Sequence, residues 1–99
     1  MFTLHAVIKG FRCAETARIF TRQRSRRLPA GIQQRAFEKL NQIDAATRLD
    51  DLRLPPSNRL EALKGDRAGH WSIRVNDQWR VCFRWLGADA DDVEIVDYH

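Results

Sequence analysis

The residues best suited to chemistry are three arginines in the second half of this 99-residue chain: Arg74, Arg80 and Arg84. They alternate with apolar residues in two segments, 71–76 and 79–85, and this periodicity predicts two β-strands. The apolar positions expected to face the core are Trp71, Ile73, Val75, Trp79, Val81, Phe83 and Trp85. These positions share one face only if the connecting loop has an odd number of residues, most simply three.

Two registers of this hairpin meet that requirement. One sets Arg74 directly opposite Arg80, and the other sets Arg74 opposite Cys82 with Asn76 opposite Arg80. In both registers the arginines share one face with Asn76 and Ser72. No acidic residue of the two strands lies on that face.

Arginines that face one another without acids destabilise a sheet unless an anion or water compensates them. The arginine face is therefore either a solvated polar surface or a site for a phosphate group. The planar guanidinium binds phosphate through two parallel hydrogen bonds, which favours arginine over lysine in such sites. Lys64 and Arg67, in the turn before the hairpin, would add cations to the site.

The last two residues, Tyr98 and His99, are a second candidate for chemistry. An imidazole can transfer protons near neutral pH, whereas a terminal histidine is often frayed and idle. His5 and His70 have no evident partner and are interpreted as ordinary surface residues. The three tryptophans could stack on nucleic-acid bases, but their place on the apolar face predicts core packing.

Metal and disulfide chemistry have weak support in the sequence. Asp89, Asp91 and Asp92 have a calcium-like spacing but lack the closing bidentate glutamate, so we expect a solvated turn. Cys13 and Cys82 lie far apart and outside any CxxC motif, which favours two reduced thiols.

The charge distribution indicates a polyanionic partner. Residues 1–50 carry 10 basic and 4 acidic side chains, whereas residues 51–99 carry 7 and 9. Five arginines lie close together without an acid: Arg18, Arg22, Arg24, Arg26 and Arg27. This arginine-rich segment is either a solvated loop or an edge that faces phosphates. The longest apolar runs are too short for a membrane span, and the N-terminus lacks the features of a secretory signal.

The elements that must position these residues follow from the periodicity. We expect strands at 6–11, 60–63 and 93–98, the last apolar on both faces as a central strand would be. Helices are expected at 13–21 and from Pro29 to about Thr47, where an apolar stripe recurs at helical spacing. We expect a loop at 49–56, because Pro55 and Pro56 exclude a helix there, and turns at 64–69 and 86–92. This order predicts a single α+β domain over residues 1–99, with two N-terminal helices packed on one face of a small, mainly antiparallel sheet.

Two stretches resemble the HigB branch of the RelE/ParE toxin superfamily, the toxins of type II toxin–antitoxin modules. They are NRLEALKGDRAGHWSIRVNDQWRVCFRW at 58–85 and VEIVDYH at 93–99. IDAAT at 43–47 and LPPSNRL at 54–60 also fit, so the resemblance covers residues 43–99. The helix from Pro29 fits more loosely, and the first dozen residues carry little of it.

The resemblance implies a RelE-like fold and a ribosome-dependent endoribonuclease that cuts mRNA without a metal or other cofactor. In that chemistry the ribose 2′-OH attacks the adjacent phosphodiester and leaves a cyclic phosphate and a 5′-OH. The reaction needs cations around the phosphate, a base for the 2′-OH and an acid for the leaving oxygen.

Carried over by position, the resemblance gives each candidate residue a role. Arg80 would stabilise the developing charge, Lys64 would be a second cation, and Asp97 would orient Tyr98 and His99, which transfer protons or stack. The substrate-binding residues would be Arg74, Asn76, Arg84 and Arg67. Some relatives carry a histidine where this chain has Glu61, so His99 and Glu61 are alternative bases. Asp97 and Tyr98 point to opposite faces of a regular strand, and both reach the site only if the strand ends or bends there.

The resemblance also implies partners and a compartment. We expect a HigA-like antitoxin with a helix-turn-helix domain, the ribosome with its mRNA, operator DNA only through the antitoxin, and no membrane. The expected location is the cytoplasm. Two alternatives stay open: a non-catalytic inhibitor of a protein target, as in the gyrase-directed ParE relatives, and an inactive module that binds RNA or antitoxin.

Overall fold

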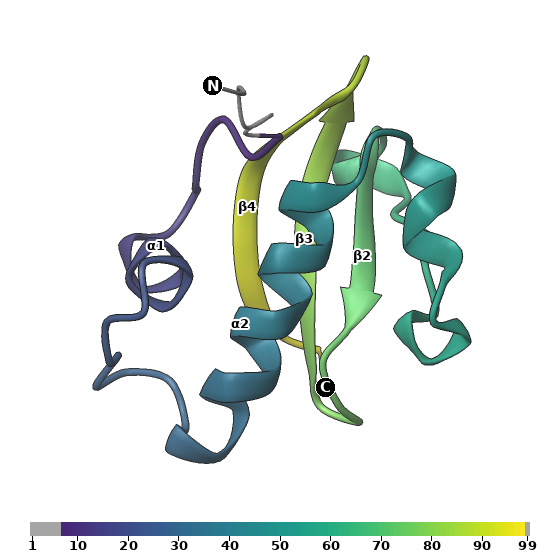
Figure 1. Ribbon diagram of the computed structural model, residues 1–99. Helices are drawn as coiled ribbons and strands as arrows, with labels where there is room; N and C mark the ends of the chain where they lie inside the picture. Colours follow the sequence, from purple (N-terminus) through teal and green to yellow (C-terminus); the bar gives the residue numbers. More distant parts are fainter. Residues whose placement is uncertain (1–6, 99) are drawn as a thin grey trace.

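The computed structural model describes residues 7–98. Its centre is an antiparallel sheet with strand order β1-β2-β3-β4: Glu61–Ala62, His70–Arg74, Trp79–Leu86 and Asp89–Asp97. Two α-helices, α1 (Ala14–Phe20) and α2 (Ala30–Ala45), lie against one face of this sheet (Figure 1). The predicted α+β architecture, with both helices on one face, is confirmed.

The β2–β3 hairpin adopts the first of the two registers. Arg74 pairs with Arg80 and Ile73 with Val81. The loop has the three residues that the apolar alternation requires, because Val75 and Trp79 are joined by a backbone hydrogen bond of 2.8 Å. Asn76 Oδ1 accepts the backbone N–H groups of Gln78 and Trp79 at 2.9 and 2.8 Å, so this side chain shapes the turn.

The core lies between the sheet and α2. The helical stripe is buried as predicted at Ile32, Ala36, Leu40 and Ile43, and the sheet contributes Ile73, Val81, Phe83 and Val93. The three tryptophans pack against this core, which confirms their structural role. Pro29 is the residue just before the first helical residue, Ala30.

The N-terminal segment is not a strand, and that prediction is wrong for the part described. Residues 7–11 form only two isolated parallel bridges to β4, Ile8 with Ala90 and Phe11 with Val93. Backbone hydrogen bonds to β4 hold the segment, Lys9 N–H to the Ala90 oxygen at 2.7 Å among them, and Asp44 Oδ1 also accepts the backbone N–H groups of Val7 and Ile8 at 3.0 and 2.9 Å. His5 and Ala6 lie outside the described residues.

The last strand also differs from its prediction. It begins at Asp89, so most of the expected turn at 86–92 is strand. A register shift between Cys82 and Arg84 accommodates Asp92, whose φ is +57°. β4 ends the sheet order and is not a central strand; the N-terminal segment lies along its outer edge.

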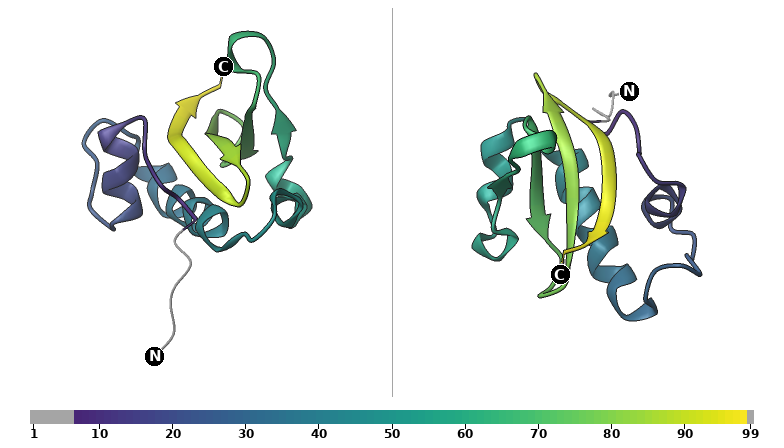
Figure 2. Two further views of the ribbon diagram at one scale, coloured as in Figure 1. Left: turned by 90° about the horizontal axis from the view of Figure 1, so that it is seen from above. Right: turned by 180° about the vertical axis from the view of Figure 1, so that it is seen from behind.

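The connections between α2 and β2 are short turns of 3₁₀ helix. They are η1 (Leu49–Arg53), η2 (Pro56–Asn58) and η3 (Gly65–Arg67), so the predicted loop at 49–56 is partly helical. The views of Figure 2 show that the face of the sheet opposite α2 is not covered by an α-helix. No helix within residues 7–98 is long and apolar enough to cross a membrane.

Candidate active site

Arg80 is buried, with 8% of its surface exposed, whereas Arg84 on the same face is exposed. Arg80 Nε donates a hydrogen bond to Ser72 Oγ at 2.8 Å, and its Nη2 donates to the backbone oxygens of Arg59 and Ser72. Arg59 adopts a left-handed conformation with φ +46°, at the end of η2. Buried guanidinium groups need such acceptors because desolvation of the charge is costly.

Two further groups complete the surroundings of this guanidinium. The Glu61 carboxylate lies 3.7 Å from Arg80 Nη2, and 56% of its side chain is exposed. The ring of Tyr98 lies over the guanidinium, with 5.7 Å between Arg80 Cζ and the ring centroid. Arg80, Glu61 and Tyr98 therefore form one cluster, and we call it the Arg80 cluster.

The end of β4 explains how Tyr98 reaches this cluster. The strand stops at Asp97, which pairs with Trp79, while Val96 pairs with Arg80. Alternation then places Tyr98 on the face of Arg80 and Asp97 on the other face. Tyr98 N–H donates to the Gln78 backbone oxygen at 2.6 Å, and Asp97 Oδ2 accepts from Gln78 Nε2 at 3.0 Å. Asp97 thus contacts the hairpin loop, and His99 lies outside the described residues.

The proposed substrate-binding residues are spread over both ends of the sheet. Arg74 lies beside Arg80 and forms an ion pair with Asp77. Asn76 is near the same end, but its carbonyl oxygen is engaged in the turn. Arg84 is exposed at the opposite end, where it pairs with His70.

Lys64 and Arg67 also lie in the turn at that opposite end. Lys64 precedes η3, and its side chain makes no hydrogen bond or ion pair within residues 7–98. Arg67 Nη2 lies 3.8 Å from Glu94 Oε1. The structure therefore brings Arg74 and Tyr98 to Arg80 and leaves Lys64, Arg67 and Arg84 in a second group.

Acids of β4 lie beside Arg67 and beside two neighbours of this second group, His70 and Arg12. His70 Nε2 lies 3.2 Å from Asp92 Oδ2, so its interpretation as a residue without a partner is wrong. Arg12 lies 3.9 Å from Asp92 and 4.0 Å from Glu94. Burial raises the pKa of the neighbouring Cys82 thiol, which keeps it protonated and unsuited to nucleophilic chemistry. Within the described residues, no group of three histidine, cysteine, aspartate or glutamate side chains could hold a metal ion.

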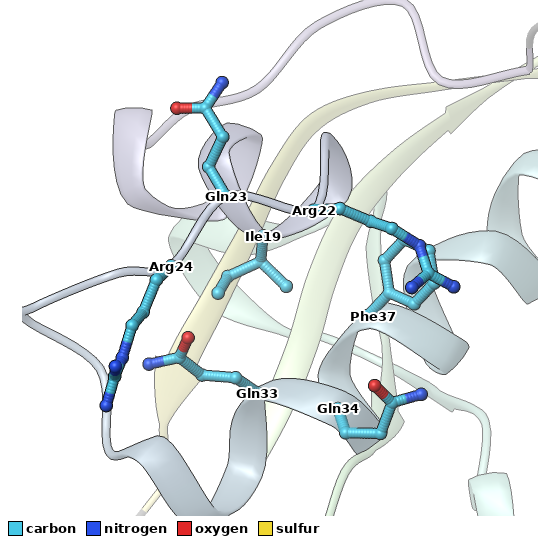
Figure 3. Close-up of a pocket in the computed structure, with 7 residues that line it drawn as sticks. All are labelled: Ile19, Arg22, Gln23, Arg24, Gln33, Gln34 and Phe37. Atoms are coloured by element: carbon cyan, nitrogen blue, oxygen red, sulfur yellow. The ribbon is translucent and has the colours of Figure 1, made fainter.

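Arg18 of the arginine-rich segment lies in α1, and the segment from Thr21 to Arg27 is an exposed loop in which Ser25 is buried. Ser25 Oγ donates to Glu15 Oε1 at 2.6 Å and accepts the backbone N–H groups of Arg27 and Leu28. The Arg22 guanidinium stacks on the Phe37 ring, 4.3 Å from its centroid. Figure 3 shows this pair at the rim of a shallow pocket between α1 and α2. The guanidinium groups of the loop therefore lie on the surface, where water or phosphate groups can reach them.

The sequence alone did not predict that Ser72 and the backbone of Arg59 would hold Arg80 in a buried position. The position of Ser72 on the arginine face was visible, but the backbone oxygen of Arg59 comes from a loop whose path no periodicity predicts. Glu61 was considered only as an alternative base, and its contact with Arg80 depends on the two-residue strand β1.

Known proteins resemble this chain over most of its length. A sequence model described as a RelE-like toxin of the type II toxin–antitoxin system HigB matches residues 9–99. Toxin HigB-1 of Vibrio cholerae is 47% identical over 68 residues, which are 69% of this chain and 72% of that protein. Endoribonuclease HigB of Proteus vulgaris is 34% identical over 93 residues, which are 94% of this chain and 100% of that protein.

Among solved structures, a YoeB/ParE toxin from Agrobacterium tumefaciens is 26% identical, with a TM-score of 0.41 over 67% of this chain and 76% of that one. The family match is the stronger finding because it extends over nearly the whole chain, including β1 to β4 and the Arg80 cluster. The chain therefore belongs to the HigB family of RelE-like toxins of type II toxin–antitoxin systems.

Proposed function

We propose that this chain is a toxin that cleaves mRNA and that the Arg80 cluster is its active site. The observation that carries the proposal is the placement of one guanidinium between a carboxylate and a phenol at the open face of the sheet. A cation, a proton acceptor and a proton donor are the groups that phosphodiester cleavage by a 2′-OH requires. The relative named Endoribonuclease HigB supports the same activity.

In the proposed reaction the 2′-oxygen forms a bond to the adjacent phosphorus and the bond from phosphorus to the 5′-oxygen breaks. A base takes the 2′-OH proton, and an acid gives a proton to the leaving 5′-oxygen. The products are a 2′,3′-cyclic phosphate and a 5′-OH, so no water, metal ion or redox partner is consumed.

Arg80 would bind the phosphate that gains negative charge in the transition state. Its Nη1 donates no hydrogen bond to a described residue, so this end of the guanidinium is available to a phosphate oxygen. The hydrogen bonds that Nε and Nη2 donate to Ser72 and Arg59 fix the orientation of the Arg80 guanidinium before substrate binds. Such pre-organisation is the main source of electrostatic catalysis.

Glu61 is the base that the geometry favours. Its carboxylate is exposed and lies beside Arg80, so a 2′-OH next to the bound phosphate would be within its reach. Tyr98 would stack on a base or donate a proton, and His99 is the second proton-transfer candidate. Asp97, through Gln78, would fix the end of β4 that carries both residues.

The roles of the other site residues stay predictions. Arg74 and Asn76 would position the phosphate from the hairpin end of the sheet. Lys64, Arg67 and Arg84 would bind the RNA strand farther from the cut, at the other end of the same face. This division follows from their distance along the strands from Arg80.

The partners follow from the toxin class and the charge. We propose a HigA-like antitoxin with a helix-turn-helix domain that contacts the operator, and the ribosome as the place where mRNA is cut, in the cytoplasm. The 10 basic side chains of residues 1–50, against 4 acidic ones, suit a surface that contacts ribosomal RNA.

A translation extract tests the proposed function. The purified chain is added to an extract that translates one defined message, and the 5′ ends of the RNA are mapped with and without ribosomes. Cleavage that requires ribosomes supports the proposal. Intact message together with a defect in DNA supercoiling would support the non-catalytic inhibitor of a protein target, and intact message without such a defect would support an inactive binding module.

A further inference from the structure

A polar pocket beside the middle of α2 lies outside the Arg80 cluster but next to it. The pocket measures about 240 Å³ and is lined by Arg35, Glu38, Lys39, Ser57, Arg74 and Val75. It lies between α2, η2 and the part of β2 that extends beyond the short strand β1. Arg74 connects the two sites, because it pairs across the hairpin with Arg80.

Lys39 is the unusual residue of this pocket, since only 8% of its surface is exposed. Its Nζ donates a hydrogen bond to Asn58 Oδ1 at 2.6 Å. Asn58 is fully buried, and its Nδ2 donates hydrogen bonds to Gln42 Oε1 and to the backbone oxygens of Leu52 and Leu54. No carboxylate among residues 7–98 forms an ion pair with Lys39, so its buried ammonium has only a neutral acceptor.

The charges around Lys39 leave the pocket short of anions. Arg35 and Arg74 are the other cations of the lining, and Glu38 is its only acid. Burial and the neighbouring Arg35 lower the pKa of Lys39, whereas Glu38 raises it. Asp77 compensates Arg74 at the hairpin tip. A buried cation without an anionic partner is costly, and a bound anion would remove that cost.

We propose that this pocket binds a phosphate group of the RNA backbone, next to the bond that is cut, through Lys39, Arg35 and Arg74. A phosphate fits the lining better than a single carboxylate, since three cations and the Ser57 hydroxyl can each donate to one of its oxygens. That this phosphate belongs to RNA rests on the proposed function. A strand held by Arg80 would reach the pocket past Arg74, on the neighbouring strand.

Inorganic phosphate is the first probe, and the readout does not involve RNA cleavage. The midpoint of thermal unfolding of the full chain is measured in phosphate and in chloride at equal ionic strength. An anion that binds the folded state raises this midpoint, and the increase grows with the logarithm of its concentration divided by its dissociation constant. Arg35→Gln should reduce the increase, and Glu38→Gln, which removes the only acid, should enlarge it. Arg35 and Glu38 are both exposed, so both variants should fold.

Arg53→Gln is the matched control, because Arg53 is an exposed arginine of η1 that does not line the pocket. Its phosphate response should equal that of the unchanged chain. If phosphate raised the unfolding midpoint equally in the unchanged chain and in all three variants, the phosphate effect would be non-specific. That result would overturn the proposal. The proposal would also be contradicted if the Glu38→Gln variant showed the same increase in midpoint as the unchanged chain, or a smaller one.

A short RNA with 2′-O-methyl groups identifies the source of the phosphate, because it binds without being cut. Arg35→Gln should weaken its binding about threefold to tenfold and reduce the slope of log affinity against log salt by about 0.7, the value for one phosphate contact of a single strand. Arg53→Gln should change neither quantity. If the Arg35→Gln variant bound this RNA as tightly as the unchanged chain does, the phosphate in the pocket would not come from RNA. Absence of message cleavage in the translation extract would overturn the proposed function and leave the inorganic-phosphate result standing.

Discussion

At the scale of single residues, the account depends on the way in which Arg80 is held. Arginine on a sheet face is usually solvated, but this one is covered by Ser72, the backbone of Arg59 and the Tyr98 ring. Those contacts give Arg80 two roles, one in stability and one in the proposed catalysis. The two roles predict that loss of the side chain affects both properties together.

Arg80→Ala should lower the free energy of unfolding by about 2–4 kcal/mol, because the backbone oxygens of Arg59 and Ser72 lose their donor in a buried site. It should also abolish cleavage. Urea unfolding followed by tryptophan fluorescence measures the first effect. Arg84→Ala, at an exposed position of the same face, should change stability by less than about 0.5 kcal/mol. Equal stability of the Arg80→Ala and Arg84→Ala variants would contradict the structural role.

Glu61→Gln tests the proposed base, since the side chain keeps its shape and loses its charge. The variant should fold normally and lose about 10²–10⁴ in cleavage rate, the usual contribution of a general base. Single-turnover cleavage on ribosomes is the measurement. Asp66→Asn, an exposed acid of η3, is the control and should cleave at the original rate. A Glu61→Gln variant of full activity would return the base role to His99.

At the scale of elements, short segments without periodicity position the site. Periodicity predicted both helices, the hairpin and its three-residue loop, because a buried stripe or an alternating face repeats over several residues. It predicted a strand at 60–63, where β1 holds Glu61 and Ala62, but it did not predict η1 or η2, which are each five residues or fewer. Hydrogen bonds with distant residues stabilise such segments, as Asp44 does for the N-terminal segment and Asn58 for the loop around Leu52 and Leu54.

Asp51 gives the η1 segment a dependence on pH. Its carboxylate accepts the backbone N–H groups of Thr47 and Arg48 and the Thr47 hydroxyl, and these hydrogen bonds lower the pKa of Asp51. A lowered pKa in the folded state stabilises the fold above the ordinary aspartate pKa, and this contribution is lost as the pH falls through the folded value. Asp51→Asn should therefore remove part of the acid destabilisation. Thermal unfolding between pH 6 and pH 3 measures it, with Asp66→Asn as the control that should behave like the original chain.

At the scale of the whole molecule, three parts far apart in the sequence lie toward the same end of the molecule. The arginine-rich loop, the tip of the β2–β3 hairpin and the last residues of β4 all lie at the lower end of the view in Figure 1. The sequence indicated each part separately, as a basic segment, a hairpin loop and a terminal pair. Their common position depends on how α1 and α2 pack against β4, for which Thr16 Oγ1, accepting the Ile95 N–H at 2.9 Å, is one contact.

Removal of Tyr98 and His99 tests whether this end of the molecule is catalytic. Tyr98 is 45% exposed and follows the last strand residue, so the chain that stops at Asp97 should keep its stability and its affinity for the antitoxin. Its cleavage rate should fall by about 10²–10⁴ if these residues transfer protons. His99→Ala separates the two residues. A shortened chain that cleaves at the original rate would exclude both from the reaction.

The central claim is that this chain cuts mRNA by attack of a ribose 2′-OH, and one modified message tests it most directly. A single 2′-deoxy nucleotide is placed on the 5′ side of the mapped cut, and ribosome-dependent cleavage is compared with that of the unmodified message. The account predicts no cleavage at the deoxy position and, in the unmodified message, a 2′,3′-cyclic phosphate at the new 3′ end. Cleavage of the deoxy message at the same position and rate would contradict it, because the nucleophile would then come from outside the RNA.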